Sequence, residues 1–418
     1  MPPATRTEPT PPSEQSARVV VVGGGVAGLE ALLALSELAP EAELTLVDPT
    51  GDFVYKPLAI EEPFSGEPPQ RHELLGLTRE LGARLICGEV DRVDADGRLV
   101  VSGGGTLIPY DFLLVCVGAR ARRAYSVADS FDIDATHSVD DLIFRAIADR
   151  TRALAVVVPP GPSWPLPGYE LALLARNRSE QLGHRELRIE LFTPEPSPLA
   201  SFGSKASQRI GDLLRARSIT LHPDSLVAEA GRRLIVRPGG EELRAGAVIS
   251  LPRLEGPRLS GVPHDFAGFI PIDEHARVIG VDRVYAAGDG ANFPVKHGGL
   301  GAQQAEAAAE HIAMRLGAVV TASPFRPVLR GRLLTGEASV HMRHDLTGGH
   351  GEGRLSLDPL WWPPGKVAAR RLGAFLAHSE GRAELDLSEG DVEIDAELPR
   401  EWHEEPMALD PVPPPQLD

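Results

Sequence analysis

A glycine-rich turn near the start of the chain constrains the fold most strongly. It reads Val-Val-Val-Val-Gly-Gly-Gly-Val-Ala-Gly over residues 19–28. The apolar run Val19–Val22 is typical of a buried parallel strand, and the Ala/Leu-rich Leu29–Leu38 predicts a helix. A second strand is predicted over Leu44–Val47, and Asp48 at its end is placed to accept hydrogen bonds from an adenosine ribose. The chain therefore opens with a β-α-β unit.

The glycines of this turn have the spacing G-x-G-x-x-G. Gly23 permits the tight turn, Gly25 lets the backbone approach a pyrophosphate, and Gly28 lets the helix pack closely on the strand. The helix start, at Val26 and Ala27, adds free N–H groups and the positive end of the helix dipole. A glycine triplet alone is compatible with an ordinary turn, but the strand, helix and acid together predict a dinucleotide site.

Two further blocks resemble the flavoproteins of the pyridine nucleotide-disulfide oxidoreductase superfamily. Residues 110–119, Tyr-Asp-Phe-Leu-Leu-Val-Cys-Val-Gly-Ala, are similar to that family's Y-D-x-L-(V/I)-x-A-T-G segment, with small departures towards its end. Residues 284–289, Val-Tyr-Ala-Ala-Gly-Asp, resemble the second FAD fingerprint. The resemblance implies FAD as the cofactor, with the aspartate carboxylate at its ribityl chain. The residues that it places at the FAD are Val117, Gly118, Gly288 and Asp289.

Within the superfamily, the chain most resembles sulfide:quinone oxidoreductases, flavocytochrome c sulfide dehydrogenase flavoprotein subunits and type II NADH dehydrogenases. Residues 53–58, Phe-Val-Tyr-Lys-Pro-Leu, follow the first acid where those proteins run a loop beside the isoalloxazine ring. The proline-rich segment 157–170 looks like a turn of the sulfide-oxidising members. The resemblance implies that Lys56 and Pro57 lie beside the flavin.

Lys56 and Lys296 are the first candidates for a catalytic role, because lysine is scarce among the 42 basic residues of this chain. An ammonium near the flavin could stabilise its anionic reduced form or donate a proton. The alternative is a surface lysine with no role. By resemblance, the helix predicted from Gly299 points its N-terminus at the flavin.

Glu170 is the third catalytic candidate. It lies in the first turn of the helix of a second β-α-β unit and could relay protons to a quinone or to the flavin; simple capping of the helix start is the alternative. Gln303 and Gln304 follow the second fingerprint, where relatives place residues near the flavin pyrimidine edge or the quinone; a solvated helix face is the alternative.

The second β-α-β unit departs from the pattern that binds NAD(P)H. Pro159 and Pro160 replace the first glycines of the turn, which removes N–H donors and obstructs the approach of a pyrophosphate. The next strand ends at Phe192 without an acid at the strand end itself. These departures argue against tight NAD(P)H binding, although the fold favours it.

The chain has two cysteines, Cys87 and Cys116. Sulfide-oxidising relatives use a redox cysteine in the proline-rich turn and another after the second fingerprint, and this chain has neither. Both cysteines fall on predicted strands, so we expect them to be buried structural thiols. Dithiol-disulfide chemistry and cysteine-based sulfide oxidation are therefore not expected.

The order of strands and helices predicts an α/β fold with two Rossmann-like three-layer domains, one inserted in the other, and a small C-terminal α+β domain. The predicted parts are a disordered tail at 1–16, an FAD-binding domain at 17–125 and 245–322, a second NAD(P)-binding-like domain at 126–244, a C-terminal domain at 323–379 and an acidic, proline-rich tail at 380–418.

The formal charge of −17 argues against a nucleic-acid partner, and much of it lies in residues 380–418, whose net charge is −11. Trp361 and Trp362, with neighbouring basic residues, suit a membrane interface; the favoured alternative is that these aromatics cap the flavin pocket or pack on the FAD domain. His341, His344 and His350 lack regular ligand spacing, so no metal is expected. The sequence carries no signal for an oligomeric state.

These features predict an FAD-dependent oxidoreductase that passes electrons from a small reductant to a quinone or another small acceptor. We expect it in the cytoplasm, with peripheral contact at the inner face of the membrane as an option. One alternative is a flavin-bearing interaction or sensing subunit of a redox complex. Another, disfavoured by the two FAD fingerprints, is a degenerate binding module without FAD.

Overall fold

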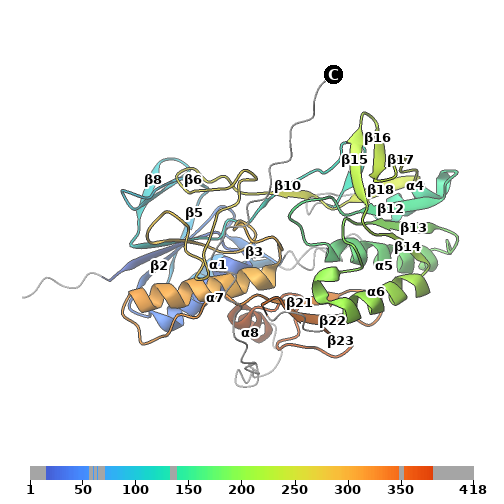
Figure 1. The fold of residues 1–418 in the computed structure, drawn as a ribbon. Helices are drawn as coiled ribbons and strands as arrows, with labels where there is room; N and C mark the ends of the chain where they lie inside the picture. The colour runs from blue at the N-terminus through green and yellow to red at the C-terminus, as the bar shows by residue number, and fades with distance from the viewer. Residues whose placement is uncertain are drawn as a thin grey trace, which may run out of the picture.

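The computed structural model describes residues 16–55, 60, 64, 71–131, 139–347 and 353–379. It contains two parallel five-stranded sheets, each covered by helices, and a smaller C-terminal unit beneath both (Figure 1). This arrangement confirms the predicted α/β class with two Rossmann-like units and a third, smaller one. The residue boundaries given above for the domains stay a prediction. Most of the two predicted tails lies outside the described residues.

The first sheet has the strand order β20-β9-β1-β2-β5. Its strands are short apolar runs because both faces are covered. Its elements are β1 (Arg18–Val22), α1 (Val26–Leu38), β2 (Glu43–Asp48), α3 (Leu74–Glu80), β5 (Arg84–Cys87), β9 (Phe112–Val115), β20 (Val284–Ala286) and α7 (Gly298–Arg315). Helices α1 and α7 share a buried core with one face of the sheet. An antiparallel sheet covers the other face and consists of β6 (Val90–Asp94), β7 (Leu99–Ser102) and β8 (Thr106–Pro109). A two-stranded ribbon, β3 (Asp52–Val54) with β4 (Arg71–Glu73), flanks the unit.

The second sheet has the order β11-β18-β12-β13-β14. Its elements are β11 (Asp129–Ser130), α4 (Val139–Ala148), β12 (Ala153–Val157), α5 (Leu166–Gln181), β13 (Arg188–Phe192), the 3-10 helix η2 (Ala200–Phe202), α6 (Ser204–Ala216), β14 (Ile219–His222) and β18 (Ala247–Ser250). Its helices bury one face in the largest apolar core of the described chain. The antiparallel strands β15 (Leu226–Ala230), β16 (Arg233–Arg237) and β17 (Glu241–Glu242) lie on the opposite face.

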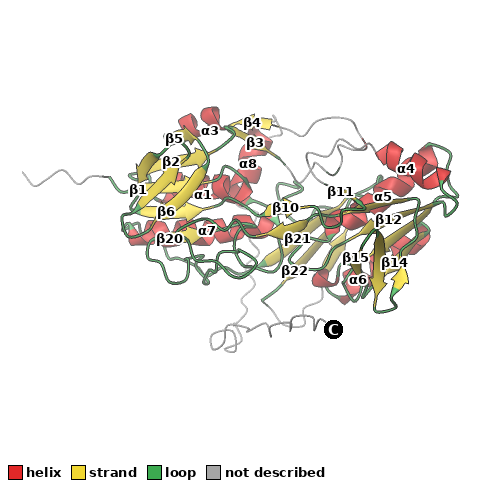
Figure 2. Cartoon of the chain, turned by 90° about the horizontal axis from the view of Figure 1, so that it is seen from above, coloured by secondary structure: helices red, strands yellow, loops and turns green. Residues whose placement is uncertain are grey.

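An antiparallel ribbon joins the two units (Figure 2). The chain leaves the first sheet after β9 through β10 (Arg120–Arg122) and returns through β19 (Arg253–Glu255) before β20. The second unit is thus inserted in the first, as predicted.

The C-terminal unit consists of β21 (Val328–Leu333), β22 (Val340–Asp345), β23 (Arg354–Ser356) and α8 (Arg370–Ser379). Leu329 and Met342 of its sheet are buried in the core of the second unit, whereas Val367 and Leu372 are buried in the core of the first. Helix α8 begins where the Glu30 carboxylate of α1 accepts hydrogen bonds from the backbone N–H groups of Arg371 (2.8 Å) and Leu372 (2.7 Å). The C-terminal unit therefore joins the other two.

Candidate functional site

The glycine turn after β1 adopts a geometry that only glycine fits at two positions. Gly23 has φ +101°, and a Cβ there would lie 2.4 Å from the Cys116 carbonyl oxygen. A Cβ at Gly28 would lie 1.8 Å from the Gly23 carbonyl oxygen. The Gly23 N–H donates to the Val47 carbonyl oxygen at 2.8 Å. These contacts hold the turn against the ends of neighbouring strands.

Gly25 is glycine for a different reason. It caps α1 without any side-chain hydrogen bond, and among the described residues a Cβ on it would meet no atom within 4 Å. Val26 is half-buried and Ala27 is buried. The helix start therefore borders open space and offers its N–H groups to it, which fits the pyrophosphate of a dinucleotide.

Asp48 is held at the end of β2, where a ribose hydroxyl is expected. Its Oδ2 accepts the Gly24 N–H at 2.8 Å, and its Oδ1 accepts the Thr50 N–H at 2.9 Å and the Gly51 N–H at 3.2 Å. The carboxylate is thus oriented before any ligand binds. Its Oδ2 accepts a single bond within the described residues, so a lone pair is left for a ribose hydroxyl.

The three sequence blocks meet at the carboxyl ends of β1, β9 and β20. A Cβ at Gly288 would lie 3.2 Å from the Ala27 Cβ, and one at Gly290 would lie 2.9 Å from the Gly118 carbonyl oxygen. Val117 is 39% exposed, beside this meeting point. The structure therefore brings together the predicted cofactor residues that it describes, although their roles stay predictions.

Lys296 is buried beside the second fingerprint. Its Nζ donates to the Ala291 carbonyl oxygen at 2.5 Å and lies 3.6 Å from the centre of the Phe269 ring. Burial lowers the pKa of this lysine to about 8, although the carboxylates of Asp289 and Asp265 oppose the shift. Lys296 is therefore no surface lysine, and its ammonium is poised to release a proton near neutral pH. Gly299 is buried in the first turn of α7, and Lys56 and Pro57 lie outside the described residues.

Glu170 does not cap its helix. It is fully buried, and its Oε1 accepts the Leu334 N–H at 2.8 Å and is ion-paired with Lys366 Nζ. Lys366 Nζ also donates to the Arg332 carbonyl oxygen at 2.6 Å. This pair links α5 to the C-terminal unit, so the capping alternative is wrong, and the role in proton transfer stays a prediction.

Two residues of this region, His297 and Lys366, were not predicted as site residues. His297 is the N-cap of α7, and its ring centre lies 4.7 Å from that of Trp164 in the proline-rich turn. Burial, with the nearby charges of Lys366 and Arg330, lowers the pKa of His297 to about 3, so its imidazole is neutral. Its buried Nδ1 has no hydrogen-bond partner in the described chain. The rarity of lysine was a signal for Lys366, but no pattern marked His297.

The proline-rich turn of the second unit is bound to the first unit. Ser163 forms a β-bridge with Val295, and Trp164 packs between the rings of His297 and Phe202. At the end of β13, the Tyr169 hydroxyl donates to Glu195 Oε2 at 2.8 Å. Burial raises the pKa of Glu195. The acid that follows this strand is thus engaged inside the protein.

Several predictions about other residues need correction. Cys87 is exposed, because it ends the edge strand β5, whereas Cys116 is buried and has its pKa raised to about 12 by burial. Gln303 and Gln304 are not on a solvated face. Gln303 exchanges two 2.9 Å hydrogen bonds with the backbone of Val328, and the buried Gln304 accepts the Gly288 N–H at 2.9 Å.

The described histidines that were considered for a metal make separate contacts. His341 packs edge-on against Trp361, and His344 Nδ1 contacts the Ser201 carbonyl oxygen at 2.6 Å. His350 lies outside the described residues, among which no group of three or more metal-ligating side chains is found. Trp361 is half-buried and packs on His341 within the C-terminal unit, whereas Trp362 is 59% exposed.

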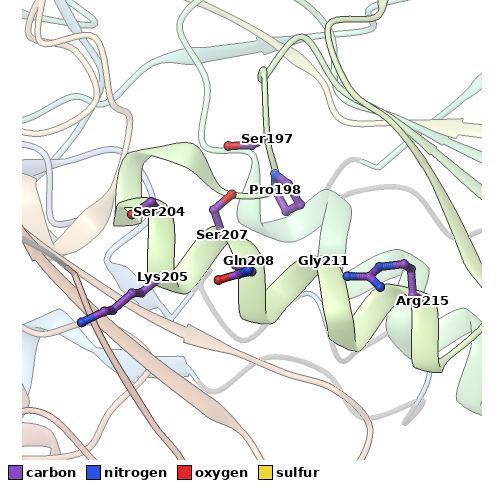
Figure 3. Close-up of a pocket in the computed structure, with 8 residues that line it drawn as sticks. All are labelled: Ser197, Pro198, Ser204, Lys205, Ser207, Gln208, Gly211 and Arg215. Atoms are coloured by element: carbon purple, nitrogen blue, oxygen red, sulfur yellow. The ribbon is translucent and has the colours of Figure 1, made fainter.

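A hollow of about 510 Å³ lies along α6, away from the glycine turn (Figure 3). Ser204, Ser207, Gln208, Gly211 and Arg215 recur along one side of the helix, with Ser197 and Pro198 opposite. It contains none of the predicted site residues.

Residues 17–311 match the family model described as pyridine nucleotide-disulphide oxidoreductase. An NADH dehydrogenase-like protein of Mycobacterium tuberculosis is 28% identical over 290 residues, covering 65% of this chain and 72% of that protein. The type II NADH:quinone oxidoreductase of the same species is 25% identical, covering 68% of each chain. In fold, the chain is similar to the crystal structure of the sulfide:quinone oxidoreductase of Aquifex aeolicus, with a TM-score of 0.71 at 18% identity over 82% of this chain and 87% of that one.

Within the described part of the chain, none of the helices combines the length and the apolar character needed to cross a bilayer. Peripheral membrane contact and a cytoplasmic location both stay predictions.

Proposed function

Because the chain belongs to the pyridine nucleotide-disulphide oxidoreductase family, we propose that it takes electrons from a small reductant other than NAD(P)H and passes them to a quinone or another small acceptor. The chain is a flavin-dependent oxidoreductase, and its cofactor is FAD. Relatives that reduce quinones support the choice of acceptor. Relatives named for NADH would suggest NADH as the donor. The contacts made by the second unit favour a different donor.

The observation that carries the proposal is that the chain's own residues occupy the contact points at which the second unit would bind a nucleotide. Pro159 and Pro160 remove N–H groups from the turn that would hold the pyrophosphate. Glu195, the first acid after the end of β13, accepts the Tyr169 hydroxyl instead of a ribose hydroxyl.

The path towards the flavin is closed as well. Trp164 stacks on His297 at the start of α7, and Ser163 pairs with Val295 of the segment after the second fingerprint. Glu170 is ion-paired with Lys366, so its carboxylate is not offered to a nicotinamide. A nicotinamide ring would have to displace these contacts to approach the flavin.

Sulfide oxidation through a cysteine pair is also disfavoured. Cys116 is buried, and its raised pKa keeps it a thiol. It packs behind the glycine turn, whereas Cys87 is exposed at the end of β5. Neither cysteine lies in the proline-rich turn or after the second fingerprint.

Bound FAD supplies the two-electron chemistry. In this proposal, Gly25, Val26 and Ala27 bind its pyrophosphate and Asp48 binds its ribose. The start of α7 and the ammonium of Lys296 add positive charge, and Lys296 Nζ can release or take up a proton because its pKa is near 8. His297 remains neutral and can accept or donate one hydrogen bond at Nδ1.

Anaerobic stopped-flow spectroscopy of the FAD-loaded protein tests the donor. We expect NADH and NADPH to bleach the flavin absorbance slowly or not at all, and rapid bleaching by either nucleotide would overturn the argument. Sulfide is a third arm, for which fast reduction would show a route independent of paired cysteines.

Photoreduction tests the acceptor separately, because it loads electrons without any natural donor. The photoreduced protein is mixed anaerobically with a short-chain ubiquinone analogue, and we expect the flavin absorbance to return rapidly. If it stays bleached with the quinone, the acceptor is wrong, and the alternative of a flavin-bearing interaction subunit gains.

A further inference from the structure

The ribbon that joins the two units is rich in exposed arginines. All three residues of β10 are exposed, and within the described chain β10 pairs with β19 alone. Its outer edge therefore presents backbone N–H and C=O groups without strand partners, which proteins usually cover or protect with charge. The ribbon begins two residues after Gly118, next to the cofactor segment.

The charges of the ribbon are poorly balanced by its own residues. Arg120 lies opposite Glu255, but Arg122 lies directly opposite Arg253, and like charges in such a cross-strand pair are unfavourable. Arg122 Nε reaches Glu255 Oε2 at 3.3 Å, and the Arg253 guanidinium lies 5.7 Å from the centre of the Tyr125 ring. Arg120 and Arg122 point to the same side of the strand, because they are two residues apart. Glu229 of β15 interacts with Arg253, so Arg120 and Arg122 share Glu255 as the one acid of the ribbon, and a further carboxylate would be favourable beside them.

The same chain contains a segment with the matching pattern. Acids stand at every second position from Glu389 to Glu397, in the order Glu-Gly-Asp-Val-Glu-Ile-Asp-Ala-Glu. In an extended chain, alternate residues lie on one side, about 6.6–6.8 Å apart, which is also the spacing of Arg120 and Arg122.

We propose that residues 389–397 dock in the same molecule along the outer edge of β10, with their carboxylates beside Arg120 and Arg122. The acids of the segment lie 10 to 18 residues beyond Ser379, the end of α8, so an extended chain carries them up to about 35–60 Å from that helix. The inference does not depend on the proposed electron donor or acceptor. Because the proposed contact is ionic, salt should weaken it.

Disulfide trapping in the full-length, FAD-loaded chain tests the contact. Ala121→Cys lies between the two arginines and on the opposite side of β10, and Ala396→Cys is placed likewise between two acids. In a Cys87→Ser background, we expect this pair to form a disulfide within one chain under mild oxidation at low salt. Val392→Cys and Ile394→Cys in place of Ala396→Cys cover other registers.

Charge variants give the decisive comparison. Arg120→Gln/Arg122→Gln should slow trapping about threefold to tenfold, as should 0.3 M NaCl, whereas Arg120→Lys/Arg122→Lys should retain the rate. The control pairs Ala396→Cys with Ser204→Cys on the exposed start of α6. Three results would each overturn the proposal: trapping at Ser204→Cys as fast as at Ala121→Cys in every register, rates indifferent to charge, and disulfides between two chains.

Discussion

Replacing Lys366 by methionine should destabilise the protein strongly, although the two side chains are similar in length. Lys366 and Glu170 are 6% and 1% exposed, so the substitution leaves a buried carboxylate with the Leu334 N–H and without its cation. Removing one partner of a buried ion pair costs about 3–5 kcal/mol. For a folded body of roughly 350 residues, that cost lowers Tm by about 4–7 °C.

The double variant Glu170→Gln/Lys366→Met separates this effect from a loss of packing. A glutamine keeps an oxygen for the Leu334 N–H and buries no charge, so we expect the cost to fall to about 1–2 kcal/mol. Arg244→Met, which removes the mostly exposed pair with Glu242, should cost about 1 kcal/mol or less. Thermal unfolding followed by circular dichroism measures all three. A double variant that loses as much stability as Lys366→Met, or a Lys366→Met cost no larger than that of Arg244→Met, would refute the reasoning.

Three further predictions follow from the site and its surroundings. Gly25→Ala should lower FAD affinity about tenfold in a fluorescence titration while the apoprotein keeps its Tm, whereas Gly28→Ala should lower the apoprotein Tm; loss of Tm in both would contradict the open space at Gly25. Lys296 has a pKa of about 8 when folded and 10.5 as its ordinary value, so the unfolded chain binds more protons between these values and the free energy of unfolding should rise with pH across them. Lys296→Met should lack this rise, and parallel pH profiles of the two proteins would count against it. Burial and the nearby Glu30 carboxylate raise the pKa of Glu306 to about 7, so stability should fall as pH rises from about 4.5 to 7, whereas Glu306→Gln, which keeps an acceptor for Arg371, should show a flatter profile in the same range.

The parts of the site that could be predicted from the sequence are those fixed by short-range geometry. The turn at Gly23 needs a positive φ and a close approach to the Cys116 carbonyl oxygen, so the residue type itself carries the signal. The same holds for Val19–Val22, whose apolar run indicates burial on both faces. The exposure of Cys87 was not predictable in this way, because it depends on which strand lies at the edge of the sheet.

The role of Glu170 shows why the remainder needs a structure. Its position in the sequence is that of an acid near a helix start, which suggests capping or proton transfer. Its ion-pair partner, Lys366, is 196 residues away, in a unit whose packing no local pattern specifies. The same is true of His297, whose neutral state depends on burial and on the charges of Lys366 and Arg330. Because these long-range contacts decide whether a carboxylate faces a substrate or a buried lysine, the position of Glu170 in the sequence cannot by itself assign it a role in proton transfer.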